Sequence, residues 1–206
     1  MFKSPRAHSY FMKKIYELIL EKALPYYEKG RKGDIEHVRW LSRTIPNFID
    51  EKEVDFDILM PLAILHDVGY SKVPRDSDPL KLDIRKLHSE EGAKIAKTIL
   101  KSLNYPQEKI KELERLILKH DNWAFGDSFA TEPYLRIFNN FDFMWVVSPK
   151  GFPAYQNIVK KDAKGTIEAI EKAQKKNVEQ GRVWYNQKIG NYYEKLLKER
   201  KKEIKQ

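Results

Sequence analysis

The sequence contains no cysteine, so disulfides, zinc–thiolate sites and thiol nucleophiles are excluded. Its longest unbroken apolar run, counting Pro61, is the eight residues 58–65. A membrane-spanning helix needs roughly 20 such residues. Residues 1–20 mix charged with apolar side chains, so no signal-peptide core is visible. These absences predict a cytoplasmic protein without a membrane partner, in which any metal ion is held by histidine and carboxylate side chains.

The chain has 206 residues, of which 41% are apolar and 33% charged, and this favours a single folded domain with a polar surface. The net charge is +9, but the basic excess is unevenly placed. Residues 160–206 contain 14 Lys or Arg and seven Asp or Glu, and they include no histidine. The charge therefore says little about what a histidine-based site binds.

Apolar residues recur at three- and four-residue spacing along most of the chain, which predicts an all-α fold. We expect a first helix interrupted by Pro25, and a second helix capped by Asp34. The nearly all-apolar residues 56–65 predict a buried helix ending near Gly69. The remaining expected elements are a long loop at 70–87, helices capped by Ser89 and opened by Pro106, an aromatic loop at 121–132, and helices at 133–147, 152–180 and 182–204.

Four of the five histidines fall within or at the ends of expected helices, whereas His8 lies near the terminus and is expected to be incidental. These four are His37, His66, His88 and His120. Adjacent side chains on a helix point about 100° apart. His66 and the following Asp67 can therefore share an ion only where their helix ends.

Asp142 stands within a strongly apolar helical segment. An unpaired carboxylate in such surroundings costs several kcal/mol, and a metal ion would make its position tolerable. A helix cap, an ion pair with Arg136 or an outward-facing position would also explain it. Imidazole and carboxylate ligands together suit Mn, Fe, Co, Ni, Zn or Mg.

In order and spacing these residues resemble the HD superfamily of metal-dependent phosphohydrolases. The family has a His, an adjacent His-Asp pair and a distal Asp, and its binuclear members have two further His in between. The matching segments are DIEHVR (His37), LHDVG (His66 and Asp67), LHSEEG (His88), LKHDNW (His120) and NNFDF (Asp142). The resemblance implies an HD-like helical bundle over about 30–148, with a C-terminal helical extension over about 152–206 of the same domain.

The resemblance further implies one or two divalent ions and a small phosphorylated substrate such as a nucleotide. His66 and Asp67 would be the catalytic pair, and His37 and Asp142 would complete the first metal site. Asp67 would reach a second ion held by His88 and His120, and Asp121 would orient an imidazole. The expected substrate-binding residues are Lys72, Arg75, Arg85 and Trp123.

Two features depart from well-known branches of the family. Residues 68–71 follow the His-Asp pair and include no glutamate, which many single-metal nucleotidases of the family have there. The cyclic-dinucleotide branch has a lysine where this chain has Tyr70, and it has a later Gly-Tyr-Pro signature that is also missing here.

The sequence leaves two other kinds of function open. A binuclear His/Asp set also resembles di-iron oxygenases that cleave C–C or C–P bonds. A non-enzymatic ligand-binding or regulatory module could use the basic C-terminal helices for nucleic acid, although nucleic-acid binding is not expected. Self-association is equally open.

Overall fold

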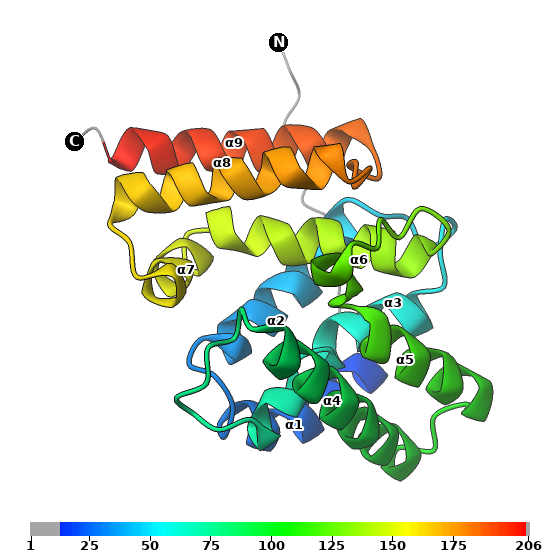
Figure 1. The fold of residues 1–206 in the computed structure, drawn as a ribbon. Helices are drawn as coiled ribbons and strands as arrows, with labels where there is room; N and C mark the ends of the chain where they lie inside the picture. The colour runs from blue at the N-terminus through cyan, green and yellow to red at the C-terminus, as the bar shows by residue number, and fades with distance from the viewer. Residues whose placement is uncertain (1–12, 205–206) are drawn as a thin grey trace.

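The structure is a computed structural model that describes residues 13–204. This part of the chain contains helices and no strand, which confirms the predicted all-α class (Figure 1). None of the helices described is long and apolar enough to cross a membrane. The α-helices are α1 (Lys14–Tyr27), α2 (Asp34–Thr44), α3 (Phe56–Leu65), α4 (Leu82–Ser102), α5 (Gln107–Lys119), α6 (Pro133–Met144), α7 (Gly151–Val159), α8 (Ala163–Glu179) and α9 (Gln187–Glu203).

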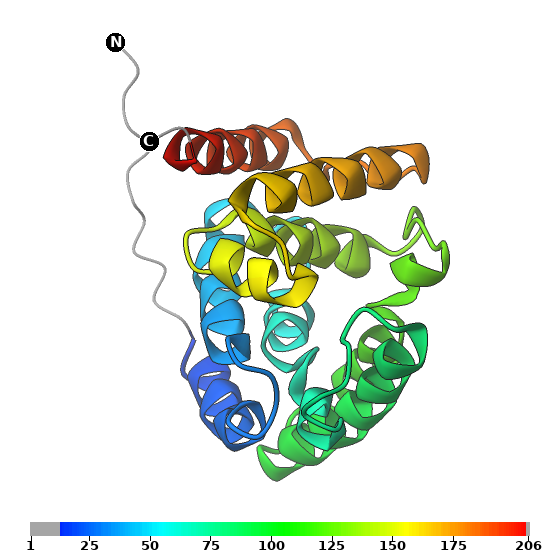
Figure 2. The ribbon, with the colours of Figure 1, turned by 60° about the vertical axis from the view of Figure 1, so that its left-hand side comes forward.

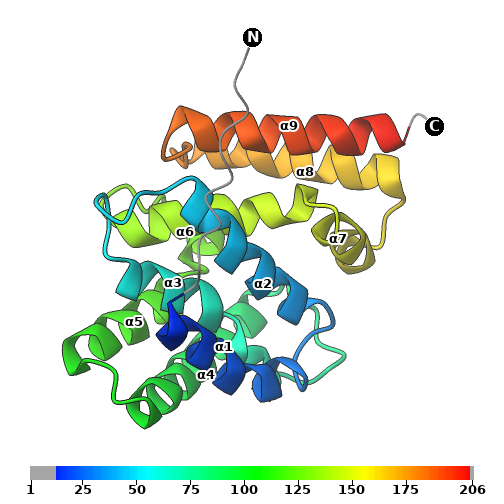
Figure 3. The ribbon, with the colours of Figure 1, turned by 180° about the vertical axis from the view of Figure 1, so that it is seen from behind.

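Helix α3 forms the centre of the core. Its N-cap is Asp55, whose carboxylate accepts the main-chain N–H of Asp57, and every side chain of the helix except that of Asp57 is buried. A helix that is apolar on all sides must be surrounded by other elements. It contacts α1, α2, α5 and α6, and Figure 3 shows α1 and α2 on one side of it. The residues that follow α3 therefore emerge inside the molecule.

The C-terminal helices α8 and α9 form an antiparallel pair at one end of the molecule, far from α1, α4 and α5 (Figures 1 and 3). Asp162 and Asn186 cap them by accepting main-chain N–H groups at their N-termini. Helix α6 lies between this pair and the rest of the bundle, and α7 packs against α8 (Figure 2). The C-terminal extension thus covers the face of α6.

The prediction that a helix begins at Ser89 is wrong, because α4 begins at Leu82. The Ser89 hydroxyl does not cap the helix; it donates to the main-chain oxygen of Arg85, one turn earlier. A serine can make this bond inside a helix, so its presence before two glutamates does not fix a helix start. The expected loop at 70–87 is correspondingly shorter, since residues 68–72 form a short 3-10 helix, η2 (Val68–Lys72).

Three smaller predictions also need correction. Pro25 lies inside α1, which continues to Tyr27. A proline removes only the one helical hydrogen bond of its own nitrogen, and here this loss does not end the helix. The cap of α2 is Gly33, with φ of 101°, and Asp34 is the first helical residue. The expected helix 152–180 is divided into α7 and α8 at Lys160, which has a left-handed φ of 53°.

Candidate metal centre

The His-Asp pair lies where α3 ends, as the sequence predicted. His66 is the C-cap of α3, and Asp67 leaves the helical conformation with φ of −102° and ψ of 4° before η2 begins. This change of direction lets the two adjacent side chains face each other. Asp67 Oδ2 lies 3.2 Å from His66 Nε2. Both side chains are buried.

Gly69 fixes the distance between this pair and α4. A Cβ atom on Gly69 would lie 1.8 Å from the main-chain oxygen of His88 and 2.5 Å from the nitrogen of Gly92. No side chain fits into that space, so η2 lies directly against the α4 backbone. This close approach places Asp67 opposite the imidazole of His88.

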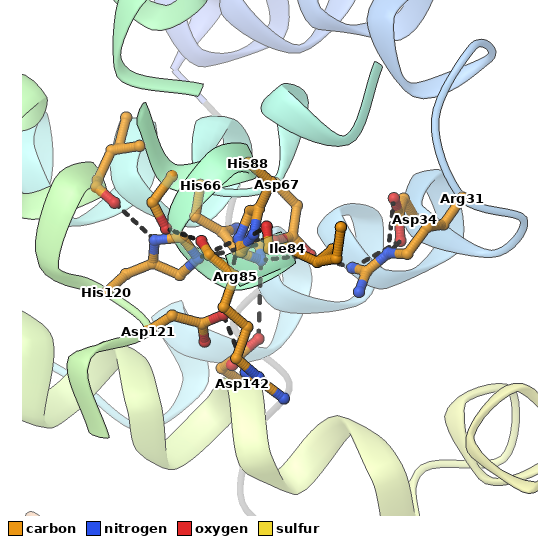
Figure 4. A network of polar contacts seen from close by, with 12 residues as sticks. Arg31, Asp34, His66, Asp67, Ile84, Arg85, His88, His120, Asp121 and Asp142 are labelled. Carbon is orange, nitrogen blue, oxygen red and sulfur yellow. Dashed lines mark hydrogen bonds and ion pairs between the residues drawn. The ribbon is translucent and has the colours of Figure 1, made fainter. Parts of the chain in front are cut away.

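Each carboxylate oxygen of Asp67 faces a different pair of histidines. Oδ2 is 3.2 Å from His66 Nε2 and 3.9 Å from His37 Nδ1. Oδ1 is 3.4 Å from His88 Nε2 and 3.7 Å from His120 Nε2. Figure 4 shows how His66, His88 and His120 gather around Asp67. The geometry forms two buried three-residue groups that could each hold a metal ion, with Asp67 common to both.

Asp142 of α6 joins the first of these groups. Its Oδ1 lies 3.2 Å from His37 Nε2 and 3.7 Å from His66 Nε2. The cap of α6 is Glu132, and Arg136 lies over the ring of Tyr185. The explanations by a helix cap or by an Arg136 pair therefore do not apply, and Asp142 faces two imidazoles.

Main-chain carbonyls orient three of the four imidazoles. The Nδ1 atoms of His66, His88 and His120 lie 3.2, 3.2 and 2.7 Å from carbonyl oxygens one helical turn earlier. A carbonyl oxygen only accepts, so Nδ1 carries the proton and the lone pair of a neutral ring lies on Nε2. The three carbonyls belong to Ala63, Ile84 and Ile117.

The nitrogen atoms that face the centre suit a metal ion. Within the described chain, Nε2 of His37 and Nε2 of His66 are buried without a hydrogen-bond partner. Such buried polar atoms are costly unless something satisfies them. Nε2 of His88 lies only 3.2 Å from Nε2 of His120, which fits two ligands of one ion with metal–nitrogen bonds of about 2.0–2.1 Å. The donor set is neutral imidazole with carboxylate, so the residues fit a divalent metal.

Aromatic rings hold two imidazoles in place. Tyr70 stacks on His88 with ring centroids 4.1 Å apart and an interplanar angle of 14°. Trp145 stacks on His37 at 5.1 Å and 23°. Together with the carbonyl contacts, this packing limits how the imidazoles can turn.

The charges at the centre keep Asp67 ionised. Burial alone raises the pKa of its carboxyl group, but the imidazole of His66 and the guanidinium group of Arg31, together with the imidazole of His120, hold this pKa well below the usual value. Burial lowers the pKa of His88. For His120, burial also acts downward, but the nearby carboxylates of Asp67 and Asp121 outweigh it and raise the pKa to about 9 while no ion is bound. A metal ion that binds there would displace this proton, since only the neutral imidazole is a ligand.

Arg31 also belongs to the centre, and it was not predictable from the sequence. Its guanidinium group pairs with both Asp67 and Asp34 (Figure 4). It also lies over the ring of Tyr70, 3.5 Å from the centroid. The only local signal was an arginine in the break between two helices, and arginines are too frequent for that to indicate a role. Arg31 supplies a positive charge beside the shared carboxylate.

A large cavity of about 1700 Å³ opens onto the centre, where it reaches His37, Asp67, His120 and Asp142. Of the expected substrate-binding residues, Arg75, Arg85 and Trp123 line this cavity. Lys72 is exposed and is not part of the cavity wall. His8 lies outside the residues that the structure describes.

Asp121 has a different role from the one expected. Its carboxylate accepts from Arg85 at 2.9 Å and from the indole N–H of Trp123 at 3.0 Å, while main-chain carbonyls orient the imidazoles instead. The sequence also gave no indication that Arg182 and Trp184, which precede α9, line the same cavity.

A comparison with protein-family models gives one match, the HD domain, over residues 34–161. The matched segment is more than half of the chain, and it contains all six residues from His37 to Asp142 that surround the centre. No curated protein and no solved structure gives a significant match. The chain therefore belongs to the HD domain family, the superfamily of metal-dependent phosphohydrolases.

Proposed function

We propose that the protein is a metal-dependent phosphohydrolase that cleaves a phosphoester of a nucleotide or another small phosphorylated metabolite. The observation that carries this proposal is Asp67, which presents one oxygen to each of two buried histidine pairs at the wall of a large cavity. Membership of the HD domain family supports the same class of reaction.

His37, His66, Asp67 and Asp142 would hold one divalent ion, and Asp67, His88 and His120 a second. A divalent ion in such a site supplies a water of lowered pKa as nucleophile and polarises a phosphoryl oxygen. The protein contributes the fixed direction of its Nε2 and carboxylate lone pairs. Because these groups are buried and braced, they need little rearrangement when the substrate enters.

The cavity wall provides groups for the substrate beside the centre. Arg85 is held by Asp121 and lies over Trp123, with its guanidinium carbon 4.6 Å from the ring centroid. A guanidinium fixed in this way can donate to phosphate oxygens through its remaining N–H groups. The volume of about 1700 Å³ exceeds the roughly 300–1,000 Å³ of an ordinary small-molecule site, so there is room for more than a bare phosphate.

The test is a panel of phosphorylated substrates assayed with Mn, Mg, Co, Ni and Fe, with protein purified without chelator and analysed for bound metal. We expect metal-dependent release of phosphate from at least one substrate. His66→Ala and Asp67→Ala should each abolish that activity and reduce the bound metal. His8→Ala is the matched control and should change neither.

Two results would contradict the proposal. Less than about half an equivalent of bound metal, with no phosphate release after Mn is added, would remove the hydrolase assignment. Bound iron with a visible absorption band and no turnover of any phosphoester would instead indicate an oxygenase.

A further inference from the structure

Arg182 is a cation of the cavity wall that packs, together with Arg85, on the indole ring of Trp123. It lies in the segment between α8 and α9, beyond the part of the chain that the HD domain model matches. Its guanidinium carbon is 4.9 Å from the ring centroid of Trp123, and that of Arg85 is 4.6 Å from the same centroid. Two guanidinium groups therefore share one indole ring inside the cavity.

The two arginines differ in their counter-charge. Arg85 forms an ion pair with Asp121 at 2.9 Å. Arg182 donates from Nη2 to the side-chain oxygens of Asn177 and Gln180, both neutral amides, and its Nε is buried without a partner. Across residues 13–204 no carboxylate forms an ion pair with Arg182.

A positioned cation without a counter-charge in the protein can bind an anion from solution. The amides of Asn177 and Gln180 hold the guanidinium in position without neutralising it. Burial lowers the pKa of Arg182 to about 10, so the side chain still carries its charge at neutral pH. A bound oxyanion would restore the solvation that the charge has lost and would also satisfy Nε.

Arg182 is connected to the candidate metal centre but is not part of it. Nε2 of His88 lies 3.7 Å from Asp121 Oδ2, Asp121 holds the indole N–H of Trp123, and Trp123 contacts Arg182. Asp121 and Trp123 thus intervene between His88 and Arg182. A substrate that reaches both places needs an anionic group separate from the phosphate that is cleaved.

We propose that Arg182, beside Trp123, binds a second oxyanion of the substrate, so that the preferred substrate carries two anionic groups. This inference rests on the proposed function and narrows it from phosphoesters in general to bisphosphates or to phosphates that also carry a carboxylate. Because Nη2 already donates to Asn177 and Gln180, the N–H groups of Nε and Nη1 are left to donate to either kind of oxyanion. The wall formed by the α8–α9 link then selects the substrate, while the centre at Asp67 acts on it.

The first arm of the test compares substrates that differ by one anionic group. Adenosine monophosphate is paired with adenosine bisphosphate, and glycerol phosphate with phosphoglycerate, so that a second phosphate and a carboxylate are tested separately. The wild type should favour the doubly anionic member of at least one pair. In Arg182→Gln, kcat/KM for that member should fall by about tenfold to a hundredfold, mainly through KM, as expected for a lost charge-assisted hydrogen bond. For the member with only one anionic group, kcat/KM should change less than twofold.

The second arm does not depend on hydrolysis. Inorganic phosphate is titrated into chelator-treated protein, and binding is followed by calorimetry. The Kd of Arg182→Gln should be at least tenfold weaker than that of the wild type, and Arg182→Lys should recover part of the affinity. Lys176→Gln removes an exposed cation one turn before the α8–α9 link and serves as the matched control, with an unchanged Kd.

The two arms separate failure of this inference from failure of the proposed function. If no phosphoester is turned over but phosphate binding depends on Arg182, the anion site stands and the hydrolase assignment falls. Equal loss of kcat/KM for both members of each pair, or a Kd that Arg182→Gln leaves unchanged, overturns the inference. A melting temperature measured for each variant shows whether Arg182 instead serves only to hold Trp123.

Discussion

The Nε2 atoms of His88 and His120 lie 3.2 Å apart, and the Nδ1 of each ring faces a main-chain carbonyl. Two neutral rings held in this way point their lone pairs at each other, so the arrangement needs a cation or a proton between them. Asp67 Oδ1 faces the same space, 3.4 Å from His88 and 3.7 Å from His120. His88, His120 and Oδ1 of Asp67 therefore form a second group of ligands, separate from the group that contains His37, His66 and Asp142.

We predict that the protein binds two metal ions, and that substitutions in one ligand group remove one ion and leave the other bound. His120→Ala should reduce the bound metal from about two equivalents to about one, and His37→Ala should do the same through the other group. Asp67→Ala should affect both, since its carboxylate belongs to both groups. Elemental analysis of protein purified without chelator and reloaded with Mn measures the ratio. Full retention of metal by His120→Ala would mean that His88 and His120 serve another purpose.

Gly69→Ala should destabilise the protein strongly. The added Cβ would overlap the main-chain oxygen of His88, and backbone atoms cannot rotate aside as a side chain can. We expect a loss of about 3 kcal/mol in the free energy of unfolding, measured by urea denaturation. Gly30→Ala is the control, because its Cβ would meet ordinary contacts at 3.5 Å and should cost about 1 kcal/mol or less. Similar losses in both variants would contradict the close contact between η2 and α4.

Arg85→Gln should weaken substrate binding without reducing the bound metal. Arg85 lines the cavity and is fixed by Asp121, whereas its neighbour Lys86 is exposed and pairs only with Glu90 among the described residues. We expect KM to rise about tenfold for any substrate that the panel identifies, with the bound metal unchanged. Lys86→Gln is the matched control and should leave KM within twofold of the wild type. A fall in kcat with unchanged KM would mean that Arg85 acts on the reaction and not on binding.

Asp57 should contribute to stability in a pH-dependent way. It accepts from Tyr16 at 2.6 Å and from Lys109 at 3.0 Å, and so links α1, α3 and α5. Burial raises the pKa of its carboxyl group, but these hydrogen bonds and the charge of Lys109 outweigh burial and hold this pKa below its usual value. Because the pKa is depressed in the folded state, the stabilisation is complete above the unfolded pKa and is lost as the pH falls through the folded pKa.

The measurement is the free energy of unfolding of Asp57→Asn against wild type between pH 7 and pH 2. At pH 7 we expect a difference of about 1 kcal/mol, since the carboxylate is partly exposed and screened by water. The difference should shrink below about pH 4. Glu21→Gln, a substitution of an exposed α1 residue, should show no such trend. A difference that stays constant with pH would show that packing, and not charge, connects these helices.

The residues around Asp67 were predictable because their chemistry is scarce in this chain. Only five histidines occur, and the chain has two adjacent His-Asp pairs, His66-Asp67 and His120-Asp121, so the order of all six positions was needed to single out Asp67. Asp142 was recognisable because its neighbours are apolar. These signals depend on residue type and local pattern, which a sequence carries directly.

Arg31 and Arg182 were not predictable, because 39 lysines and arginines give no local sign of which ones turn inward. Their positions depend on how distant segments pack. The start of α4 was misplaced for a related reason, since Ser89 has the same neighbours whether it caps a helix or bonds back to Arg85. The left-handed turn at Lys160 carries neither glycine nor proline at that position, the usual signs of a helix break.

The cavity wall comes from two parts of the chain: residues 27–161, most of which the HD domain model matches, and residues of α8 and of the link between α8 and α9. Exchanging that link, while α2 to α6 stay as they are, would alter which molecules are accepted and leave the ion-binding groups in place. The link between α8 and α9 is therefore a starting point for redesigning the substrate preference of this protein, because it can be changed without altering the metal-binding residues.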